Sequence, residues 1–452
     1  MSLLLDRGAD INLVGEIYGT PLAAAALQGH METVLLLLRR GANVNTVGGA
    51  YGTALAAAAY RGDKQMVSLL MRRGADCHVL GGTYGTALVA AVCGWCPLIV
   101  SLLLDGGADI NMVGGTYGTA LAAAAFGGNK SIVLLLLERG AKINAVGGTW
   151  GTALASAAHS GNDEMVALLL DWGADINMVD DTYGGALGAA SVGGKKWVVL
   201  LLLDRGADVN VVGGTYGTAL AGAAYRGNEE IVTLLLDRGA DIHEVGGTYG
   251  TALAAAAYGG KTSTVSLLLG RGADVNAVGG TYGTALAAAA YSGSEGVVPL
   301  LLEHEADVWC VGGNYETTSG VYPSVLDAAH AEGSRASSTL LALLQSAVTG
   351  ARNQPTHPQG DILEDAIARP PFPMPYTERD SVLLYTHRTS LTTSSSRDIL
   401  SSAECCVDGN ITPELADVAC REVTEDVLYR SLAALVGVHN DSAHKNSRKI
   451  DA

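Results

Sequence analysis

The chain has little of what several classes of function require. Only 16% of its 452 residues are charged, and 45 acidic side chains against 28 basic ones give a net charge of −17. Nucleic acids and anionic membrane surfaces bind basic faces, so this balance argues against both as partners. The apolar runs are far shorter than the roughly 20 residues of a membrane-spanning helix. A neutral or basic protein is the electrostatically favoured partner.

Cysteine is also scarce, and its spacing is irregular. The seven cysteines are odd in number, so no disulfide framework is predicted, which favours an intracellular, reducing location. We expect the cytoplasm, with the nucleus as an open alternative. The apolar run that starts at Met1 stops at Asp6, which is too short for a secretory signal.

Two short motifs resemble chemical sites, but their surroundings are wrong. Cys93 and Cys96 have the spacing of a redox pair, yet they lie between two predicted helices and not in a βαβ unit. Residues 259–262 resemble part of a phosphate-binding loop, but Ala255 stands where that motif needs glycine and a helix precedes it. We therefore predict no catalytic residues, no bound metal, no cofactor and no enzymatic activity.

The chain is rich in one thing, which is internal repetition. An aromatic residue recurs every 33 residues, as Tyr18, Tyr51, Tyr84, Tyr117, Trp150, Tyr183, Tyr216, Tyr249 and Tyr282. The neighbouring sequence repeats with it, as in residues 214–220. A fixed period of this size indicates a solenoid of stacked units. Such a fold presents a long, shallow surface, which favours binding of another macromolecule.

One unit, around Thr218, illustrates the predicted structure. Thr218 is a good helix N-cap before an Ala-rich helix, and Gly227 ends that helix. The apolar stripe of residues 231–236 predicts a second helix, which Gly239 stops. Residues 246–247 (Gly-Gly) then predict a turn into the next unit. Each unit is therefore helix, tight turn, helix and a Gly-rich hairpin loop.

These residues resemble the ankyrin repeat, whose unit also has 33 residues. The matching features are the Thr and Leu at the first helix start, the Ala-Ala pair, the glycines and the Leu stripe, over about residues 3–348. The resemblance implies an all-α, ankyrin-type solenoid that binds partners on a concave side. Where the family usually has Thr-Pro-Leu-His, this chain has Thr-Ala-Leu-Ala, and only residues 20–22 keep the proline.

The recurring Gly-Gly-x-Tyr-Gly-x-Ala-Leu style is similar to ankyrin arrays of filamentous fungi, often found C-terminal to a NACHT module. The pattern also predicts how the chain is divided. We expect a partial repeat at 1–12, nine regular repeats at 13–310, an insertion and C-terminal capping repeat at 311–350, a mostly disordered Pro/Ser/Thr-rich linker at 351–410, and a tail at 411–452 with one amphipathic helix.

The recurring aromatic residues have two interpretations. A ring repeated without change is what packing between identical units demands, and we favour that interpretation. The alternative is a row of aromatic contacts for a partner, since Tyr is well suited to interfaces. We call this set the hairpin ladder: Tyr51, Tyr84, Tyr117, Trp150, Tyr183, Tyr216, Tyr249 and Tyr282.

The residues nine and ten positions after each ladder residue differ between repeats, and they end the first helix. By resemblance to ankyrin arrays they line the concave, partner-facing side, and aromatic residues and Arg are prominent among them. Drift in a duplicated array is the alternative explanation. The candidate partner-binding residues are Tyr60, Arg61, Phe126, His159, Tyr225, Arg226, Tyr258 and Tyr291. We expect Tyr225 and Arg226 to be largely exposed.

The sequence thus predicts a non-enzymatic scaffold that binds a protein on its concave surface. The alternative is the ligand-sensing arm of a larger NACHT-type receptor, of which this chain would be a fragment. Residues 1–12 contain only the end of a second helix, so the next repeat is predicted to expose apolar surface. We expect either an upstream extension or self-association through that edge.

Overall fold

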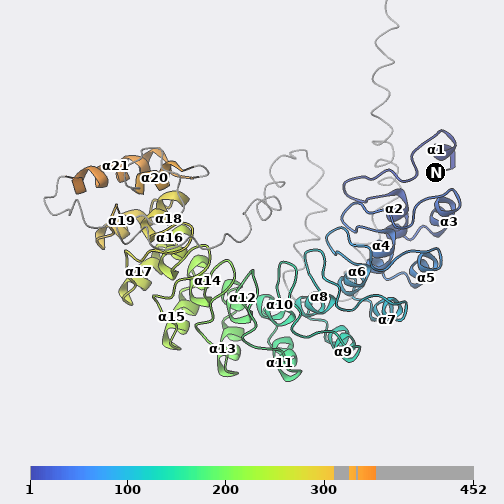
Figure 1. Ribbon diagram of the computed structural model, residues 1–452, viewed down its shortest axis with the longest axis horizontal. Helices are drawn as coiled ribbons and strands as arrows, with labels where there is room; N and C mark the ends of the chain where they lie inside the picture. Colours follow the sequence, from blue (N-terminus) through green and yellow to red (C-terminus); the bar gives the residue numbers. More distant parts are fainter. Residues whose placement is uncertain (1, 310–324, 332–333, 353–452) are drawn as a thin grey trace, which may run out of the picture. The chain divides into compact units, whose positions relative to one another are not determined.

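The computed structural model describes residues 2–309, 325–331 and 334–352. Helices in this part of the chain alternate between two layers (Figure 1). We call the even-numbered helices α2–α18 the inner layer and the odd-numbered helices α3–α19 the outer layer. Each inner helix packs closely on the next inner helix, whereas neighbouring outer helices touch less. The predicted all-α solenoid is confirmed.

The inner helices are α2 (Pro21–Gln28), α4 (Ala54–Arg61), α6 (Ala87–Cys93), α8 (Ala120–Phe126), α10 (Ala153–Ser160), α12 (Ala186–Val192), α14 (Ala219–Arg226), α16 (Ala252–Tyr258) and α18 (Ala285–Ser292). The outer helices are α3 (Met31–Arg39), α5 (Lys64–Arg72), α7 (Pro97–Asp105), α9 (Lys130–Glu138), α11 (Asp163–Asp171), α13 (Lys196–Asp204), α15 (Glu229–Asp237), α17 (Thr262–Gly270) and α19 (Val297–Glu303). Helix α1 (Ser2–Asp6) precedes them, and α20 (Val325–His330) and α21 (Ser338–Arg352) follow.

Threonine starts the inner helices, as the sequence predicts. The Thr218 hydroxyl accepts a hydrogen bond of 3.1 Å from the backbone N–H of Ala221, which satisfies one of the free donors of the first turn. The same cap is present at Thr20, Thr53, Thr86, Thr119, Thr152, Thr251 and Thr284. Helix α12 is the exception in the inner layer, because Gly185 precedes it and offers no side chain.

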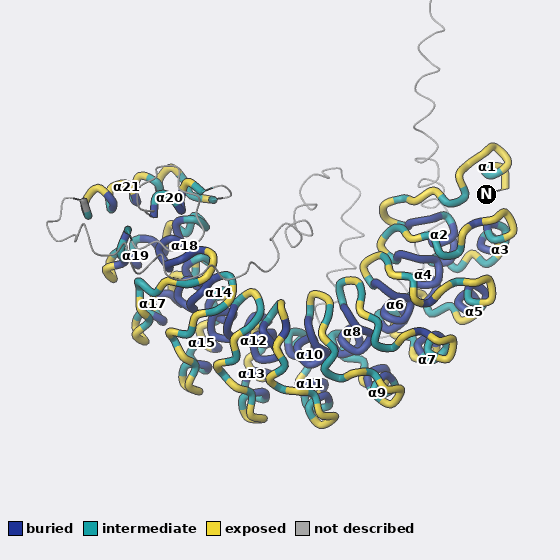
Figure 2. The backbone as a smooth tube through the Cα atoms, in the orientation of Figure 1, coloured by how far each residue is buried: buried dark blue, intermediate teal, exposed yellow. Residues whose placement is uncertain are grey.

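The two layers have different side chains and different burial (Figure 2). Inner helices are mostly alanine and are buried along nearly their whole length, so their backbones approach closely. Outer helices bury one stripe of larger side chains, such as Ile231, Val232 and Leu235, and expose the rest. Each fully buried Leu contributes roughly 1.5–3 kcal/mol, so most of the stability lies between layers and between repeats.

The hairpin loops connect neighbouring repeats through their backbones. The N–H of Thr248 donates to the carbonyl of Thr215 at 2.7 Å, and Thr281 donates to Thr248 at the same distance. Close approach requires glycine at the hairpin base. A Cβ at Gly217 would lie 2.3 Å from the backbone of Gly246, and the φ of Gly217 is +82°. These backbone bonds join repeats in a chain that lacks the family's usual histidine.

A second connection between repeats lies in the loop after each outer helix. Asp208 Oδ1 accepts the N–H of Asn210 at 2.9 Å, which fixes the loop. The Asn210 side chain then accepts the N–H of Asp241, in the next repeat, at 2.8 Å. We call this second bond the asparagine clamp; it recurs from Asn12, Asn45, Asn111, Asn144, Asn177 and Asn276. These two bonds explain the Gly-Ala-Asp-x-Asn sequence that recurs in many of the repeats.

The C-terminal part of the described chain continues the inner layer. Helix α20 packs on α18, and α21 packs on α20. The N–H of Arg335 donates to the carbonyl of Tyr291 at 2.8 Å, which ties this segment to the last regular repeat. Helix α21 runs to Arg352, so the first two residues of the predicted linker are helical. The insertion before Tyr322, the rest of the linker and the predicted tail helix lie outside the described residues.

Candidate functional site

The two aromatic columns that the sequence analysis separates are one continuous stack. The Tyr60 ring, at the end of α4, lies 5.2 Å from the rings of both Tyr51 and Tyr84, which are themselves 5.6 Å apart. Phe126, His159, Tyr225 and Tyr258 likewise pack between the ladder ring of their own repeat and that of the next. We call the combined set the aromatic stack: Tyr51, Tyr60, Tyr84, Tyr117, Phe126, Trp150, His159, Tyr183, Tyr216, Tyr225, Tyr249, Tyr258, Tyr282 and Tyr291.

The stack forms because of where the chain places these residues. A ladder residue stands two positions before the N-cap threonine, at the base of the hairpin, and its partner ring stands on the last turn of the same inner helix. The short, alanine-rich helix has no bulk to separate them. Neighbouring ladder rings also stack on each other, and they are slightly farther apart where Cys93 and Val192 replace the second ring. Their centroids are 6.2 Å apart at Tyr84 and Tyr117 and 6.5 Å apart at Tyr183 and Tyr216, against 5.8 Å at Tyr216 and Tyr249.

The expected exposure of Tyr225 is wrong. Tyr225 is half-buried, with its ring 5.2 Å from Tyr216, 5.0 Å from Tyr249 and 6.3 Å from Tyr258. A ring between stacked rings loses most of its contact with water, so the hairpin tyrosines and the helix-end tyrosines share one structural role. Arg226 is exposed, as expected.

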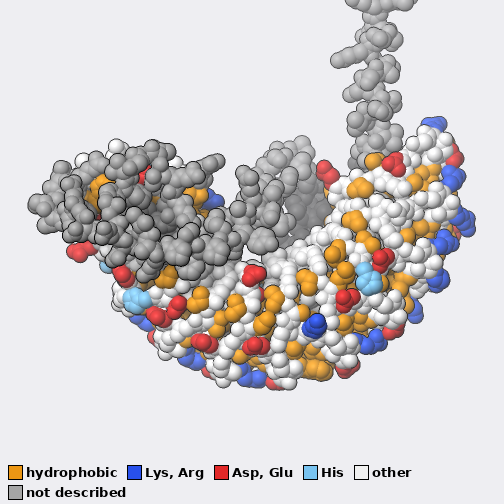
Figure 3. Space-filling view, viewed as in Figure 1, with side chains coloured by type: hydrophobic (Ala, Val, Ile, Leu, Met, Phe, Trp, Pro, Cys, Tyr) orange, Lys and Arg blue, Asp and Glu red, His pale blue; other side chains and the backbone are white. Residues whose placement is uncertain are grey.

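Burial in the stack disfavours ionisation of several of its phenols. Burial raises the pKa of Tyr183 to about 12, and it raises the pKa of Tyr84 and Tyr249 further. Tyr249 and Tyr282 are buried, and the other rings of the stack are half-buried. Tyr84, Tyr183 and Tyr249 are therefore uncharged at physiological pH. Hydrophobic side chains recur from repeat to repeat on the face drawn in Figure 3, with acidic groups between them.

The two candidate arginines differ in their surroundings. The Arg61 guanidinium donates to the carbonyl of Leu27 at 3.0 Å, so it is fixed on the preceding repeat. Arg226 has no hydrogen bond or ion pair with any other residue that the structure describes. It lines an open pocket of about 510 Å³ together with Val192, Lys196 and Glu229. Arg226 is thus a cation available to a partner beside the aromatic stack.

The centre of the stack contains its chemical exceptions. Trp150 is the one ladder residue that is not tyrosine, His159 is the one imidazole of the stack, and their rings lie 4.6 Å apart. Trp150 also stacks on Phe126 at 4.6 Å. Burial lowers the pKa of His159 to about 4, and the nearby charges of Lys195 and Arg226 act in the same direction. His159 is therefore neutral at physiological pH.

Asp180 is the second exception, and it stands where the other hairpins have glycine. Only 2% of the residue is exposed, and its Oδ1 accepts the backbone N–H groups of Thr182 at 2.9 Å and Tyr183 at 2.6 Å. Burial raises the pKa of its carboxyl, although these backbone donors oppose the shift. Thr182 gives Asp180 the N–H that the threonines of neighbouring hairpins, such as Thr149, give to the preceding repeat.

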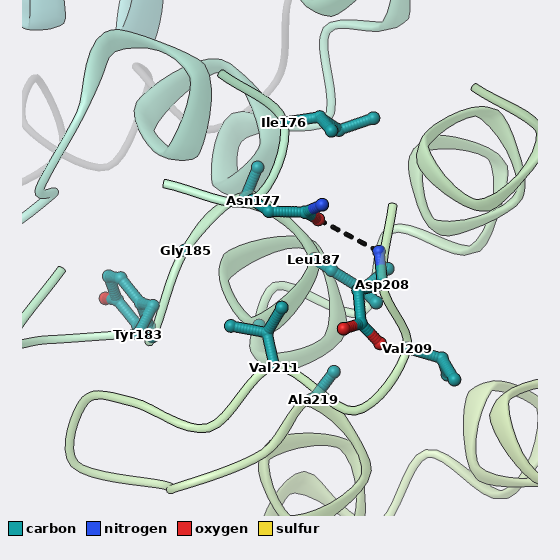
Figure 4. Close-up of a pocket in the computed structure, with 12 residues that line it drawn as sticks. Ile176, Asn177, Tyr183, Gly185, Leu187, Asp208, Val209, Val211 and Ala219 are labelled. Atoms are coloured by element: carbon teal, nitrogen blue, oxygen red, sulfur yellow. Dashed lines mark hydrogen bonds between the residues drawn. The ribbon is translucent and has the colours of Figure 1, made fainter. Parts of the chain in front are cut away.

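The start of the inner helix that follows Asp180 also departs from the common pattern. Gly185 takes the N-cap place of threonine with φ +120°, a conformation in which a side chain is strained. A cavity of about 10 Å³, lined by Tyr183, Leu187 and Val209, lies beside it, near the asparagine clamp from Asn177 (Figure 4). Neither Gly185 nor Ser156, a buried serine in the alanine-rich helix α10, is among the residues predicted from the sequence. Both are found by asking which repeat departs from the common residue at each position.

Buried polar atoms without a partner occur in this same region. Among the described residues they are Trp150 Nε1, Ser156 Oγ, His159 Nδ1 and Asp180 Oδ2. Such atoms normally find hydrogen-bond partners, and each one left without costs about 1–3 kcal/mol. The fifth regular repeat and the hairpin that follows it are therefore the least satisfied part of the described array.

The two chemical motifs discounted from the sequence have structural roles. Cys93 ends α6 and Cys96 caps α7, and the Cys96 thiol donates to the carbonyl of Gly94 at 3.1 Å. Burial raises the pKa of Cys93 to about 12, which disfavours a reactive thiolate. Gly259 and Lys261 form the turn between α16 and α17, with a helix on either side.

The comparison with known families agrees with the paired helices and the 33-residue period. The model of the family "Ankyrin repeats (3 copies)" matches residues 1–80, 55–147, 147–213 and 220–311, which is more than half of the chain. The chain belongs to the ankyrin-repeat family. Ankyrin repeats are in general non-enzymatic modules that bind other proteins. The search of curated proteins returned no match.

Two further predictions concern membrane binding and the narrower similarity to fungal arrays. Within the described residues of this ankyrin array, no helix is both long enough and apolar enough to cross a bilayer. The narrower similarity to fungal arrays next to NACHT modules stays a prediction, because the family match covers the ankyrin repeats themselves.

Proposed function

We propose that this ankyrin array is a non-enzymatic scaffold that binds a neutral or basic protein along the face of the aromatic stack. The observation that carries the proposal is the position of Arg226. This exposed guanidinium stands at an open pocket of about 510 Å³, next to the half-buried ring of Tyr225. Arg and Tyr are the residue types that most often dominate binding energies.

The surroundings of Arg226 favour a mixed contact. A planar guanidinium binds a carboxylate with two hydrogen bonds and stacks on aromatic rings. Lys196 and Glu230, at the same pocket, are paired at 3.0 Å and so largely neutralise each other. Because the chain has a net charge of −17, the partner as a whole is neutral or basic, with an acidic or aromatic side chain directed at Arg226.

The first experiment identifies a partner by affinity capture with the array, followed by mass spectrometry. We then expect Tyr225→Ala with Arg226→Ala to weaken binding of a verified partner by about 2 kcal/mol or more. Because Tyr225 is half-buried, Arg226→Ala alone is the cleaner variant, and stability is measured in parallel.

The matched control is Arg238→Ala, which removes an exposed Arg that is paired with Asp204 after an outer helix. It should leave affinity unchanged. Wild-type affinity in both Arg226→Ala and the double variant would remove the helix ends from the binding site. The hairpin ladder would then be the better candidate.

The second candidate function is the ligand-sensing arm of a NACHT-type receptor. It is favoured by the recurring Gly-Gly-x-Tyr-Gly-x-Ala-Leu style and uses the same surface. Transcript mapping tests it. A P-loop module encoded upstream in the same reading frame would support this candidate, and a transcript that starts at Met1 would refute it.

A further inference from the structure

The loop after α5 is chemically different from its counterparts. In the other repeats the middle residue of the equivalent loop is Val or Ile, as in Asp208-Val209-Asn210, and the third residue is Asn except at His243 and Trp309. Here it reads Asp76-Cys77-His78, which places a carboxylate, a thiol and an imidazole on three consecutive residues. His78 takes the place of the asparagine that makes the clamp to the next repeat, and its side chain contacts its own loop instead.

The three side chains converge on one point. The Cys77 Sγ lies 3.6 Å from Nδ1 of His78, and Asp76 Oδ1 lies 3.1 Å from the same nitrogen. All three donor atoms lie within 4.8 Å of one another. In tetrahedral zinc sites with bonds of about 2.0–2.3 Å, ligand atoms are roughly 3.3–3.6 Å apart. The two distances to His78 Nδ1 are close to that spacing.

The imidazole nitrogen that the thiol and the carboxylate contact distinguishes two kinds of chemistry. In a nucleophilic relay, the thiol and the carboxylate contact opposite nitrogens of the imidazole ring, so that one activates and the other orients. Here both contact Nδ1. Donor atoms gathered around one point, with Nε2 directed elsewhere, are the arrangement of ligands around an ion.

The loop is also held in place before any ion binds. The N–H of Asp76 donates to Asn45 of the preceding repeat at 2.9 Å, and Asp76 Oδ1 accepts the N–H of His78 at 2.8 Å. Cys77 is buried, whereas about half of the Asp76 and His78 side chains is exposed. An ion can therefore reach the loop from solvent without a change of fold.

From this geometry we infer that Asp76, Cys77 and His78 bind one zinc ion, with water as the fourth ligand. Thiolate, imidazole and carboxylate together suit zinc better than magnesium or calcium, which prefer oxygen ligands alone. On binding, the Cys77 thiol loses its proton to solvent and the sulfur forms the metal bond. The repeat at Asp241-Ile242-His243 lacks the thiol and serves as an internal comparison.

The test uses Co²⁺ as a spectroscopic probe and Zn²⁺ as competitor, on the full chain under reducing conditions. Wild type should bind one Co²⁺ with a sulfur-to-cobalt charge-transfer band, which Zn²⁺ abolishes. Zn²⁺ should also raise the melting temperature. Cys77→Val and His78→Asn convert the loop to the form found in other repeats, so both variants should fold.

Cys77→Val should lose the band and the thermal shift, and His78→Asn should weaken Co²⁺ binding by at least about tenfold. His243→Asn, which changes the comparison loop, should leave both unchanged. Because the chain has six other cysteines, a band that persists in Cys77→Val would place the metal elsewhere and overturn the proposal. Absence of any band in wild type would overturn it as well.

Discussion

Two pairs of repeats share the same arrangement of helices but differ in their hydrogen bonds. One pair is the seventh and eighth repeats, and the other is the fifth and sixth. In the former, Thr218 and Thr251 cap their helices, and Thr248 bonds to Thr215 across the hairpins. In the latter, glycine replaces one cap and Asp180 replaces a hairpin glycine. Both pairs bury a stripe of outer-helix side chains at the same positions, so the differences lie at the hairpin, the helix start and the ends of the inner helices.

This contrast shows how a repeat array tolerates substitutions that depart from the common residue of each position. Each unit is stabilised mainly by its neighbours, so a hairpin with an unpartnered polar atom persists between well-packed units. The region with unpartnered polar atoms lies at the middle of the regular repeats, beside Arg226, whose charge acts on His159.

The largest effect is expected from the shared apolar stripe. Leu235→Ala removes a fully buried side chain of the seventh repeat and should cost about 2–5 kcal/mol of unfolding free energy. Leu169→Ala, at the same position of the fifth repeat, should cost a similar amount, as chemical denaturation would measure. A much smaller cost at Leu169 would mean that the central repeats are loosely packed as well as poorly satisfied.

The next effect concerns pH. The folded state lowers the pKa of His159 to about 4, so the unfolded chain binds the proton more tightly. Stability should be full above about pH 6.5 and fall by up to about 3 kcal/mol as the pH decreases towards 4. His159→Tyr should remove this loss in denaturation curves measured at several pH values. An unchanged pH profile in His159→Tyr would contradict the burial argument.

A smaller change, this time an increase in stability, is expected when Asp180 in the hairpin is replaced. Asp180→Gly removes a buried carboxylate with one unpartnered oxygen and should stabilise the chain at pH 7 by about 1–2 kcal/mol. The raised pKa of Asp180 means that the folded state prefers the neutral carboxyl, so the gain should shrink as the pH falls towards 4.

Hydrogen exchange provides a second measurement on Asp180→Gly. The Thr182 N–H should become available to bond the preceding hairpin, as Thr215 does with Thr182. The reverse substitution, Gly213→Asp, should destabilise a regular hairpin, because a side chain there meets Val179. Equal stability of wild type and both variants would remove the distinction between the two regions.

The smallest effect is expected at Ser156, which stands where most inner helices have alanine. Its hydroxyl is fully buried and unpartnered, so Ser156→Ala should raise the unfolding free energy by up to about 1 kcal/mol. Thermal unfolding can measure a change of this size. Destabilisation would mean that the hydroxyl has a partner in solution.

Much of the fold was predictable from local sequence. The threonine caps, the glycines after each helix and the Leu stripe each depend on interactions within one 33-residue unit. Glu305 illustrates the same logic, because it replaces a helix-ending glycine and keeps that glycine's left-handed conformation, with φ +64°. The candidate site was predicted less well. Its residues were named, but Tyr225 was expected to be exposed.

The sequence by itself determined the period, the family and the helix boundaries, because those follow from capping, propensity and apolar spacing within each unit. Only the tertiary structure decided which repeated residues meet across units. It merged two aromatic columns into one stack, buried Asp180, and left Arg226 open while Arg61 is bonded. These contacts depend on how closely and at what angle one repeat packs on the next. The 33-residue period along the chain does not specify that packing.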